Sequence, residues 1–228
     1  MSRTPSNVVA VLAVLTVALV LFAAKATSGA SRQLSGPVAA PVIDAIVTSP
    51  SEDTAVFAGG CFWGIEAVFE HVKGVKSAVS GYAGGNVGNP SYEQVSTGDT
   101  GHAESVQVIY DPSQVSYGKL LQIFFSVAHD PTQLNRQGPD HGTQYRSAIF
   151  YNTLQQQQVA ESYIKQLTAA KTFSRPIVTQ VAKLRAFYPA EAYHQDYLVH
   201  HPNQLYIMIN DQPKVAALKK QFPTEYRN

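Results

Sequence analysis

The chain has 228 residues and a formal net charge of +1, with 45% hydrophobic and 14% charged residues. This length is enough for one good-sized core and does not require two domains. The near-neutral charge gives no electrostatic reason to expect nucleic-acid binding. Because Cys61 is the only cysteine, an internal disulfide is excluded, and the residue is expected to be either a free reactive thiol or paired with another molecule.

The N-terminal residues have the pattern of an export signal. Arg3 precedes the almost wholly apolar stretch 8–24, and small residues such as Ser28-Gly29-Ala30 follow. This order is typical of a secretory signal peptide. The apolar stretch is slightly shorter than the roughly 20 residues of a transmembrane helix, but an uncleaved anchor with Arg3 inside is the alternative. We therefore predict residues 1–30 as a signal peptide or signal anchor and an exported protein (periplasmic, extracellular or in a secretory compartment).

A linker and one folded domain are predicted after this signal. Residues 31–53 are rich in Ser, Pro, Ala and Val without periodicity, which predicts a flexible linker. In the domain 54–228, apolar alternation predicts strands at 54–58, 75–83, 103–110, 145–151 and 177–182. Helical periodicity predicts helices after Cys61 and at 116–128, 154–170, 190–198 and 213–221. This mixture predicts a single α+β domain, with helices packed on a mixed β-sheet in a two-layer sandwich.

Cys61 occupies a turn between the first predicted strand and the first predicted helix. Gly59 and Gly60 permit a sharp turn, and the apolar residues after it recur with helical spacing. Free N–H groups and the positive dipole end of a helix stabilise an anion. We therefore expect the Cys61 thiol to be reactive with a lowered pKa. The alternative is a buried structural cysteine.

Three further polar segments are candidates for a site. Glu104 opens the strand 103–110, either as a general acid with a raised pKa or as an exposed strand-start residue. Asp140 and Tyr145 belong to a long loop rich in polar side chains, a usual place for site residues. That loop could equally be held together by its own hydrogen bonds. The third segment, 193–201, contains three histidines, but their spacing matches no standard zinc pattern.

These segments together resemble the peptide methionine sulfoxide reductase A family. The resemblance covers roughly residues 54–226 and is carried by these stretches in order: Gly60-Cys61-Phe62-Trp63-Gly64, Gly81-Tyr82-Ala83-Gly84-Gly85, Tyr92-Glu93-Gln94-Val95, Thr100-Gly101-His102-Ala103-Glu104, Tyr110-Asp111-Pro112, His129-Asp130-Pro131-Thr132, Asp140-His141-Gly142-Thr143-Gln144-Tyr145-Arg146-Ser147 and Tyr193-His194-Gln195-Asp196-Tyr197. Enzymes of this kind reverse methionine oxidation, one enzyme for each sulfoxide epimer.

The resemblance implies a role for each matching residue in reducing the S epimer. The implied catalytic and substrate-binding residues are Cys61 as the nucleophile, Phe62 and Trp63 as an apolar wall for the substrate methyl, Tyr92 and Tyr145 as phenols that hydrogen-bond the sulfoxide oxygen, Glu104 as the acid that protonates it, and Asp140 as a residue that helps fix the site. Oxidised proteins, peptides and free methionine sulfoxide are the implied substrates. A monomer is expected, with no bound cofactor and no metal.

The chain departs from many members of that family at the regeneration step. Those members carry resolving cysteines, whereas no cysteine follows Cys61 here. We therefore expect an external thiol to attack the Cys61 sulfenic acid. A thioredoxin-like protein, a glutaredoxin-like protein or a small thiol would serve as this reductant.

Two other functions are weighed against this interpretation. A cysteine hydrolase would pair Cys61 with His102, His129 or His141 as the base, and sequence separation alone does not exclude it. A non-catalytic module that docks oxidised methionine side chains is the second alternative.

Overall fold

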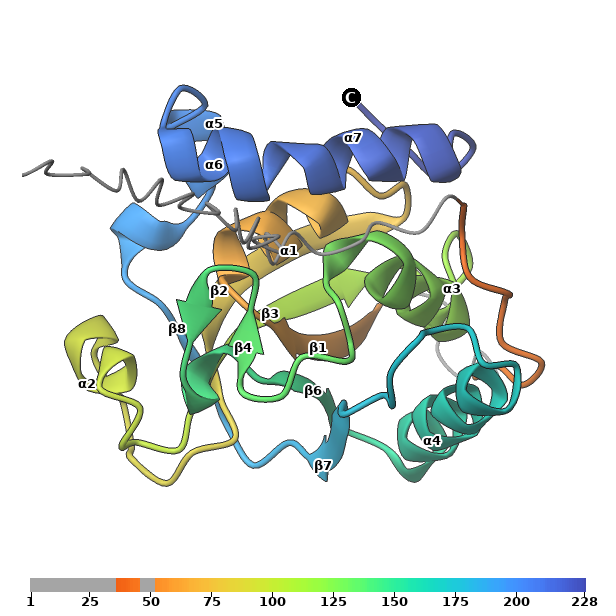
Figure 1. Ribbon diagram of the computed structural model, residues 1–228, viewed down its shortest axis with the longest axis horizontal. Helices are drawn as coiled ribbons and strands as arrows, with labels where there is room; N and C mark the ends of the chain where they lie inside the picture. Colours follow the sequence, from red (N-terminus) through yellow and green to blue (C-terminus); the bar gives the residue numbers. More distant parts are fainter. Residues whose placement is uncertain (1–35, 46–51) are drawn as a thin grey trace, which may run out of the picture.

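The computed structural model describes residues 36–45 and 52–228 (Figure 1). The predicted signal or anchor, residues 1–30, lies outside the described residues, as does much of the predicted linker 31–53. Within the described part of the chain, no helix is both long and apolar enough to cross a membrane.

A six-stranded mixed sheet, in the order β7-β6-β1-β3-β2-β8, organises the domain. Its strands are β1 (Asp53–Gly59), β2 (Val75–Ala83), β3 (Ala103–Tyr110), β6 (Ser147–Tyr151), β7 (Gln180–Lys183) and β8 (Phe187–Pro189). The β6–β7 pair is parallel, and the other pairs of this sheet are antiparallel. The short strands β4 (Arg136–Gln137) and β5 (Asp140–His141) form a separate ribbon. The predicted α+β class with a mixed sheet is confirmed.

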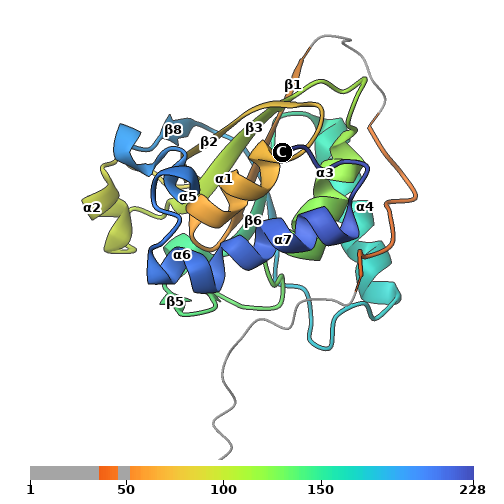
Figure 2. The ribbon, with the colours of Figure 1, turned by 90° about the horizontal axis from the view of Figure 1, so that it is seen from above.

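Helices pack mainly against one face of this sheet. The described helices are α1 (Phe62–Glu70), α2 (Tyr92–Ser96), α3 (Tyr117–Ile123), α4 (Leu154–Ala169), α5 (Tyr197–His200), α6 (Leu205–Asn210) and α7 (Gln212–Gln221). α3 continues into a π-helical turn, Phe124–Ala128. Figure 2 shows α7 lying along α1, with α3 and α4 beside them. The C-terminal helix therefore reaches the element that follows Cys61.

The core fills both faces of the central strand β1. Phe57 stacks between Phe69 of α1 and Phe124, with ring centroids 5.2 and 4.9 Å apart. Successive side chains of a strand point to opposite faces, so Val56 and Ala58 belong to a smaller cluster on the other face. Because β1 is packed on both faces and paired on both edges, the turn that follows it has a rigid base.

The predicted helix over 190–198 is wrong in its continuity. The chain instead forms a 3-10 turn, Ala192–His194, and then α5, with Asp196 between them in the left-handed region at φ 52°. The Gln195 side chain donates to the backbone oxygens of Ser80 and Ala190, which draws the chain onto the sheet edge. Asp tolerates the left-handed conformation better than most residues, so the break falls there.

The predicted flexible linker is also incorrect where it is described. Val38 is buried in the core at 4% exposure. Its backbone N–H donates to Ser126 Oγ and its backbone oxygen accepts from Gln122 Nε2. Asp44 accepts from the Ser116 hydroxyl and from the backbone N–H of Gly118 at the start of α3. Residues 36–45 therefore form part of the packed domain, because one apolar side chain and matched polar partners hold them there.

The Asp44 contacts predict a measurable loss of stability in Asp44→Ala. Removing an acceptor from the first turn of a helix costs about 1 kcal/mol, so the urea midpoint should fall with an unchanged m-value. Asp99→Ala, which alters an exposed loop residue, is the matched control. Equal midpoints for Asp44→Ala and Asp99→Ala would contradict the packed role of this segment.

Candidate active site

Cys61 lies at the N-terminal boundary of α1, directly after the turn that ends β1. Gly60 adopts φ +102°, and a Cβ there would collide with the Gln137 side chain. Glycine is therefore required at this turn both for its conformation and for close packing. The predicted strand, turn and helix around Cys61 are confirmed, and the thiol is 7% exposed.

The expected lowering of the Cys61 pKa is wrong for the structure as it stands. Burial raises the pKa of the thiol well above its ordinary value, and the charges of Glu104 and Asp211 raise it further. The Trp63 backbone N–H and the Lys214 ammonium lower it, but they do not prevail. Desolvation therefore outweighs the helix N-terminus, and Cys61 rests as a neutral thiol.

Glu104 is a buried acid rather than an exposed strand-start residue. It extends from β3 at 2% exposure, and its Oε2 accepts from the Phe62 backbone N–H at 3.1 Å. Burial, followed by the charges of Asp140 and Asp211, raises its pKa to about 8 against the lowering effect of that hydrogen bond. At neutral pH the carboxyl is therefore mostly protonated and able to donate, directly beside the peptide bond that follows Cys61.

Tyr92 and Tyr145 approach this acid from two separate segments. Tyr92 is the first residue of α2, and Tyr145 ends the 3-10 turn Thr143–Tyr145. Burial, and next the charge of Glu104, raises the pKa of each phenol, and the charge of Cys61 raises both as well. The structure thus brings both predicted phenols to Cys61 and Glu104. Tyr145 lies outside the predicted strand 145–151, since β6 starts at Ser147.

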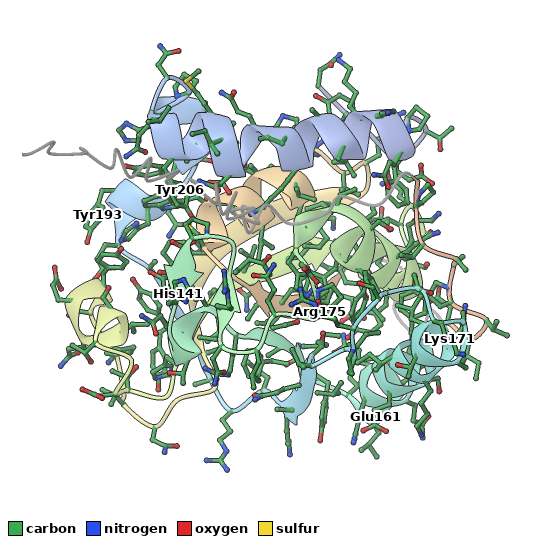
Figure 3. The ribbon with its side chains drawn as sticks, viewed as in Figure 1. His141, Glu161, Lys171, Arg175, Tyr193 and Tyr206 are labelled. Atoms are coloured by element: carbon green, nitrogen blue, oxygen red, sulfur yellow. The ribbon has the colours of Figure 1, made fainter. Side chains whose placement is uncertain are left out.

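Asp140 borders the same space through a partner that sequence reasoning missed. It belongs to β5 and accepts a hydrogen bond from the Tyr206 hydroxyl of α6. Burial raises the pKa of Tyr206, and the charge of Cys61 is the next largest cause. Tyr206 therefore lies at the site, although it occurs in a segment with no recognisable motif. Figure 3 shows Tyr206, His141 and Tyr193 on the same side of the molecule.

An apolar wall forms around Trp63. Its ring stacks on Tyr197 with centroids 3.7 Å apart and planes at 5°, and Tyr206 meets it edge-on. Its Nε1 donates to His194 Nδ1 at 3.2 Å. Phe62 is fully buried and packs against Trp63, Tyr82 and His194. Trp63 is thus the partly exposed part of the predicted wall, and Phe62 supports it from within.

Glu191 ties the wall to the phenol side, a role that sequence reasoning missed. Its Oε1 accepts from the Tyr92 backbone N–H and its Oε2 from the Tyr82 hydroxyl, both at 2.8 Å. His194, three residues later, holds Trp63. One short segment therefore positions side chains on both sides of Cys61.

A buried ion pair from the C-terminal helix supports the first turn of α1. Lys214 Nζ lies 3.0 Å from Asp211 Oδ1, and the Asp211 side chain is fully buried. A Cβ on Gly64 would collide with Asp211 and lie 2.7 Å from Lys214 Nζ. Gly64 therefore lets α7 bring both charges close to Cys61, which explains their opposite effects on the pKa of its thiol.

The histidines of the hydrolase alternative have other partners. The His129 ring bonds Ser147 Oγ and the Phe124 backbone oxygen, and burial lowers its pKa to about 4. His102 accepts from the Gly85 N–H and bonds the Val87 backbone oxygen, which holds the glycine-rich loop. His141 is exposed on β5. Across the described residues, no three His, Cys, Asp or Glu side chains form a metal-binding group.

Comparisons with known proteins agree with this geometry. A family model described as "Peptide methionine sulfoxide reductase" matches residues 53–226. "Peptide methionine sulfoxide reductase MsrA 2" of Mesorhizobium japonicum is 60% identical over 178 residues, covering 78% of this chain and 91% of the relative. The protein of the same name from Synechocystis is 52% identical over 185 residues, covering 80% of this chain and 86% of the relative.

Two solved structures have a fold similar to that of this chain. Methionine sulfoxide reductase A of Corynebacterium diphtheriae matches with a TM-score of 0.59 and 37% identity, over 75% of this chain and 88% of that one. Reduced Mxr1 from Saccharomyces cerevisiae matches with a TM-score of 0.60 and 33% identity, over 67% of this chain and 87% of that one.

The buried Glu104 predicts a specific pH dependence of stability. Its pKa of about 8 in the folded protein exceeds the unfolded value of about 4.3, so the folded state retains a proton that the unfolded state loses between these values. Stability should therefore fall as pH rises through this window, by up to about 1.4 kcal/mol per pH unit from this group.

Glu104→Gln should flatten this slope in urea unfolding measured between pH 5 and pH 8. Glu93→Gln changes an exposed carboxylate of α2 and should follow the wild type. Parallel curves for Glu104→Gln and the wild type would show that Glu104 does not retain its proton.

Proposed function

The chain belongs to the peptide methionine sulfoxide reductase family, and we propose that it reduces the S epimer of methionine sulfoxide through Cys61, in oxidised proteins and as the free amino acid. The family makes the protein an oxidoreductase. The observation that carries the residue assignment is Glu104, a buried and protonated acid whose carboxyl accepts from the peptide N–H next to Cys61.

The first half-reaction oxidises Cys61 and reduces the substrate. The thiol sulfur attacks the sulfoxide sulfur while Glu104 donates a proton to the sulfoxide oxygen, a poor leaving group until it is protonated. The hydroxyl then passes from the methionine sulfur to the Cys61 sulfur: a Cys61 S–O bond forms, the methionine S–O bond and the new sulfur–sulfur bond break, methionine leaves, and Cys61 is left as a sulfenic acid. Two electrons pass from the cysteine sulfur to the methionine sulfur. The thiol proton replaces the one that Glu104 supplies, so the acid is restored.

The side chains around Cys61 divide the work of holding the substrate. The phenols of Tyr92 and Tyr145 hydrogen-bond the sulfoxide oxygen and stabilise the charge that develops there. Asp140, held by Tyr206, fixes the oxygen side of the site. The partly exposed Trp63 ring, supported by Phe62 and Tyr197, receives the terminal methyl. This division orients the sulfur toward Cys61.

An external thiol completes the cycle. With one cysteine in the chain, the Cys61 sulfenic acid condenses with the sulfur of an outside thiol and releases water. A second thiol then attacks the mixed disulfide, which frees Cys61 and leaves a disulfide on the reductant. The two thiols supply both electrons, so this cycle runs without a bound cofactor. A thioredoxin-like protein, a glutaredoxin-like protein or a small thiol has the required chemistry.

We also propose that the protein repairs oxidised proteins outside the cytoplasm and acts as a monomer. The support for export is the sequence pattern of residues 1–30, an apolar stretch after Arg3 with small residues following. That pattern allows either a cleaved signal or an anchor over residues 8–24. Cell fractionation with N-terminal sequencing of the mature chain decides between them.

A single-turnover experiment tests the proposed function. Enzyme mixed with an S-sulfoxide peptide and no reductant should reduce about one methionine sulfoxide per chain, because only Cys61 supplies electrons. Intact mass spectrometry should show one added oxygen per chain. In a parallel sample, dimedone should form an adduct with the sulfenic acid at Cys61. The R epimer should give no product. A panel of thiol donors added afterwards identifies the reductant.

Cys61→Ser is the decisive variant for this experiment. It should bind the peptide but form no reduced peptide. Reduction of the peptide by Cys61→Ser at the wild-type amplitude would refute Cys61 as the nucleophile. If the wild-type protein were a cysteine hydrolase, it would instead cleave the peptide without reducing its sulfoxide.

Glu104→Gln is expected to slow the single-turnover step by about 10²- to 10³-fold, because it removes the general acid. Wild-type turnover should decline as pH rises through about 8, the pKa of Glu104, and the variant should lack this limb. Alkylation of Cys61 should persist in the variant, which separates loss of acid catalysis from loss of the thiol. Full activity of Glu104→Gln would rule out the acid role.

A further inference from the structure

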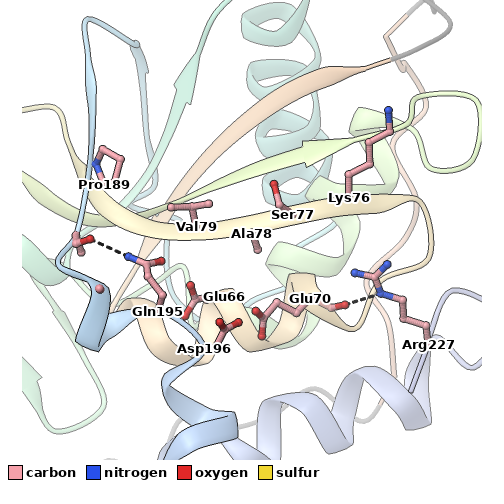
Figure 4. Close-up of a pocket in the computed structure, with 12 residues that line it drawn as sticks. Glu66, Glu70, Lys76, Ser77, Ala78, Val79, Pro189, Gln195, Asp196 and Arg227 are labelled. Atoms are coloured by element: carbon pink, nitrogen blue, oxygen red, sulfur yellow. Dashed lines mark hydrogen bonds between the residues drawn. The ribbon is translucent and has the colours of Figure 1, made fainter.

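A concave site away from Cys61 lies between α1 and the outer edge of β2. It is a cavity of about 640 Å³, and Figure 4 shows Glu66 and Glu70 reaching it from α1, Asp196 from the segment before α5, and Arg227 from the C-terminal end of the chain. Cys61 does not line this cavity. The cavity is thus distinct from the site described above.

The three carboxyl groups of this cavity form one cluster (Figure 4). Glu66 is 1% exposed, and its Oε1 accepts from the Ser80 backbone N–H at 3.2 Å. Its Oε2 is buried and makes no hydrogen bond of normal geometry with the described residues, although the Ser80 hydroxyl and the Asp196 backbone N–H lie near enough to lower the pKa of this carboxyl. A buried carboxyl oxygen without a donor is unfavourable, so this oxygen is a site for a ligand's donor group.

Protons partly neutralise the cluster in the structure. Burial raises the pKa of Glu66 to about 7. Burial, and then a side-chain hydrogen bond with Asp196, raises the pKa of Glu70 to about 8. Arg227 lowers the pKa of Glu70, but its Nε donates to the Glu70 backbone oxygen at 2.6 Å. A ligand cation would therefore displace protons from this cluster.

The β2 strand presents an unpaired edge to the same cavity. β8 pairs with β2 at residues 81–83 only, and at Ser80 the backbone groups on the outer side bond Gln195, Glu66 and Ala190. Backbone groups of a strand alternate between its two sides, so those of Ala78 face outward like those of Ser80. Within the described sheet, no strand covers this edge at Ala78.

We propose that this groove binds an extended polypeptide segment that contains a lysine or arginine. The segment adds as a strand to the β2 edge at Ala78, and its cationic side chain enters the cluster of Glu66, Glu70 and Asp196. Strand addition supplies main-chain hydrogen bonds, and a side-chain pocket supplies specificity. This binding goes beyond the reductase activity and does not depend on it.

The chemistry of the groove favours an organic cation over a metal ion. The three carboxyl groups are not arranged as a metal-binding group in the described structure, and the cavity is far larger than a metal ion. A guanidinium or ammonium group supplies several N–H donors on a long stem. Such a group can reach the buried Glu66 Oε2 and offset the charge left when the shared protons leave.

Isothermal titration with a methionine-free heptapeptide tests the proposal. The probe is acetyl-Thr-Val-Thr-Arg-Thr-Val-Thr-amide, and its partner carries citrulline in place of arginine. The arginine peptide should bind at least tenfold more tightly. Titrations at pH 7.5 in two buffers of different ionisation enthalpy should show protons released on binding. Equal affinity of the two peptides, or no binding of either, would overturn the proposal.

Two variants separate the cluster from the edge. Glu66→Gln/Glu70→Gln should weaken binding of the arginine peptide at least tenfold and abolish proton release, while Glu93→Gln should change neither.

Ala78→Pro removes the outward N–H without removing a bond to β3 and should also weaken binding of the peptide tenfold, whereas Ala78→Ser should not. Glu70→Gln alone, with its carboxyl only partly buried, serves if the double variant does not fold. Unchanged binding in the cluster variant would refute the role of the carboxyl groups, and unchanged binding in Ala78→Pro would refute strand addition at the β2 edge.

Discussion

The hydrogen bond from the Phe62 backbone N–H to the Glu104 carboxyl is the contact on which the site depends. It links the first turn of α1 to the sheet and places an acid against the peptide that follows the thiol. Because the pair is buried, the carboxyl retains its proton and Cys61 retains its own. In the proposed reaction, the same desolvation prepares the donor for the sulfoxide oxygen and leaves the nucleophile uncharged until substrate arrives.

The segments that complete the site come from the last third of the chain and are anchored away from Cys61. Gln195 fastens the chain to the β2 edge, and on either side of this anchor Glu191 holds Tyr92 and Tyr197 supports Trp63. Asp211 and Lys214 then bring α7 onto the first turn of α1. The geometry around Cys61 is thus fixed by contacts that are long-range in sequence, which is consistent with a preorganised site.

The strands that alternate and the helices with clear periodicity could be predicted, because burial imposes those patterns locally. Cys61, Glu104, Tyr92 and Tyr145 could be named from motifs, and the structure brings them together. Tyr206, Glu191 and Lys214 could not, because each acts through a partner more than sixty residues away. The lowered thiol pKa was expected from the helix N-terminus alone. This prediction is wrong because the cost of burying the thiolate depends on tertiary packing, which the sequence around Cys61 does not show.

The burial of Cys61 has a consequence for how readily peroxides in solution oxidise its thiol. Peroxides oxidise thiolates far faster than neutral thiols, and here the sulfur is both protonated and 7% exposed. We therefore expect the resting Cys61 thiol to react slowly with peroxides. In the proposed mechanism, reaction requires a substrate that brings its oxygen to Glu104. The burial that keeps Cys61 neutral also keeps Glu104 protonated. In the proposed mechanism, slow reaction with bulk oxidants and reactivity toward a bound sulfoxide therefore have the same physical cause.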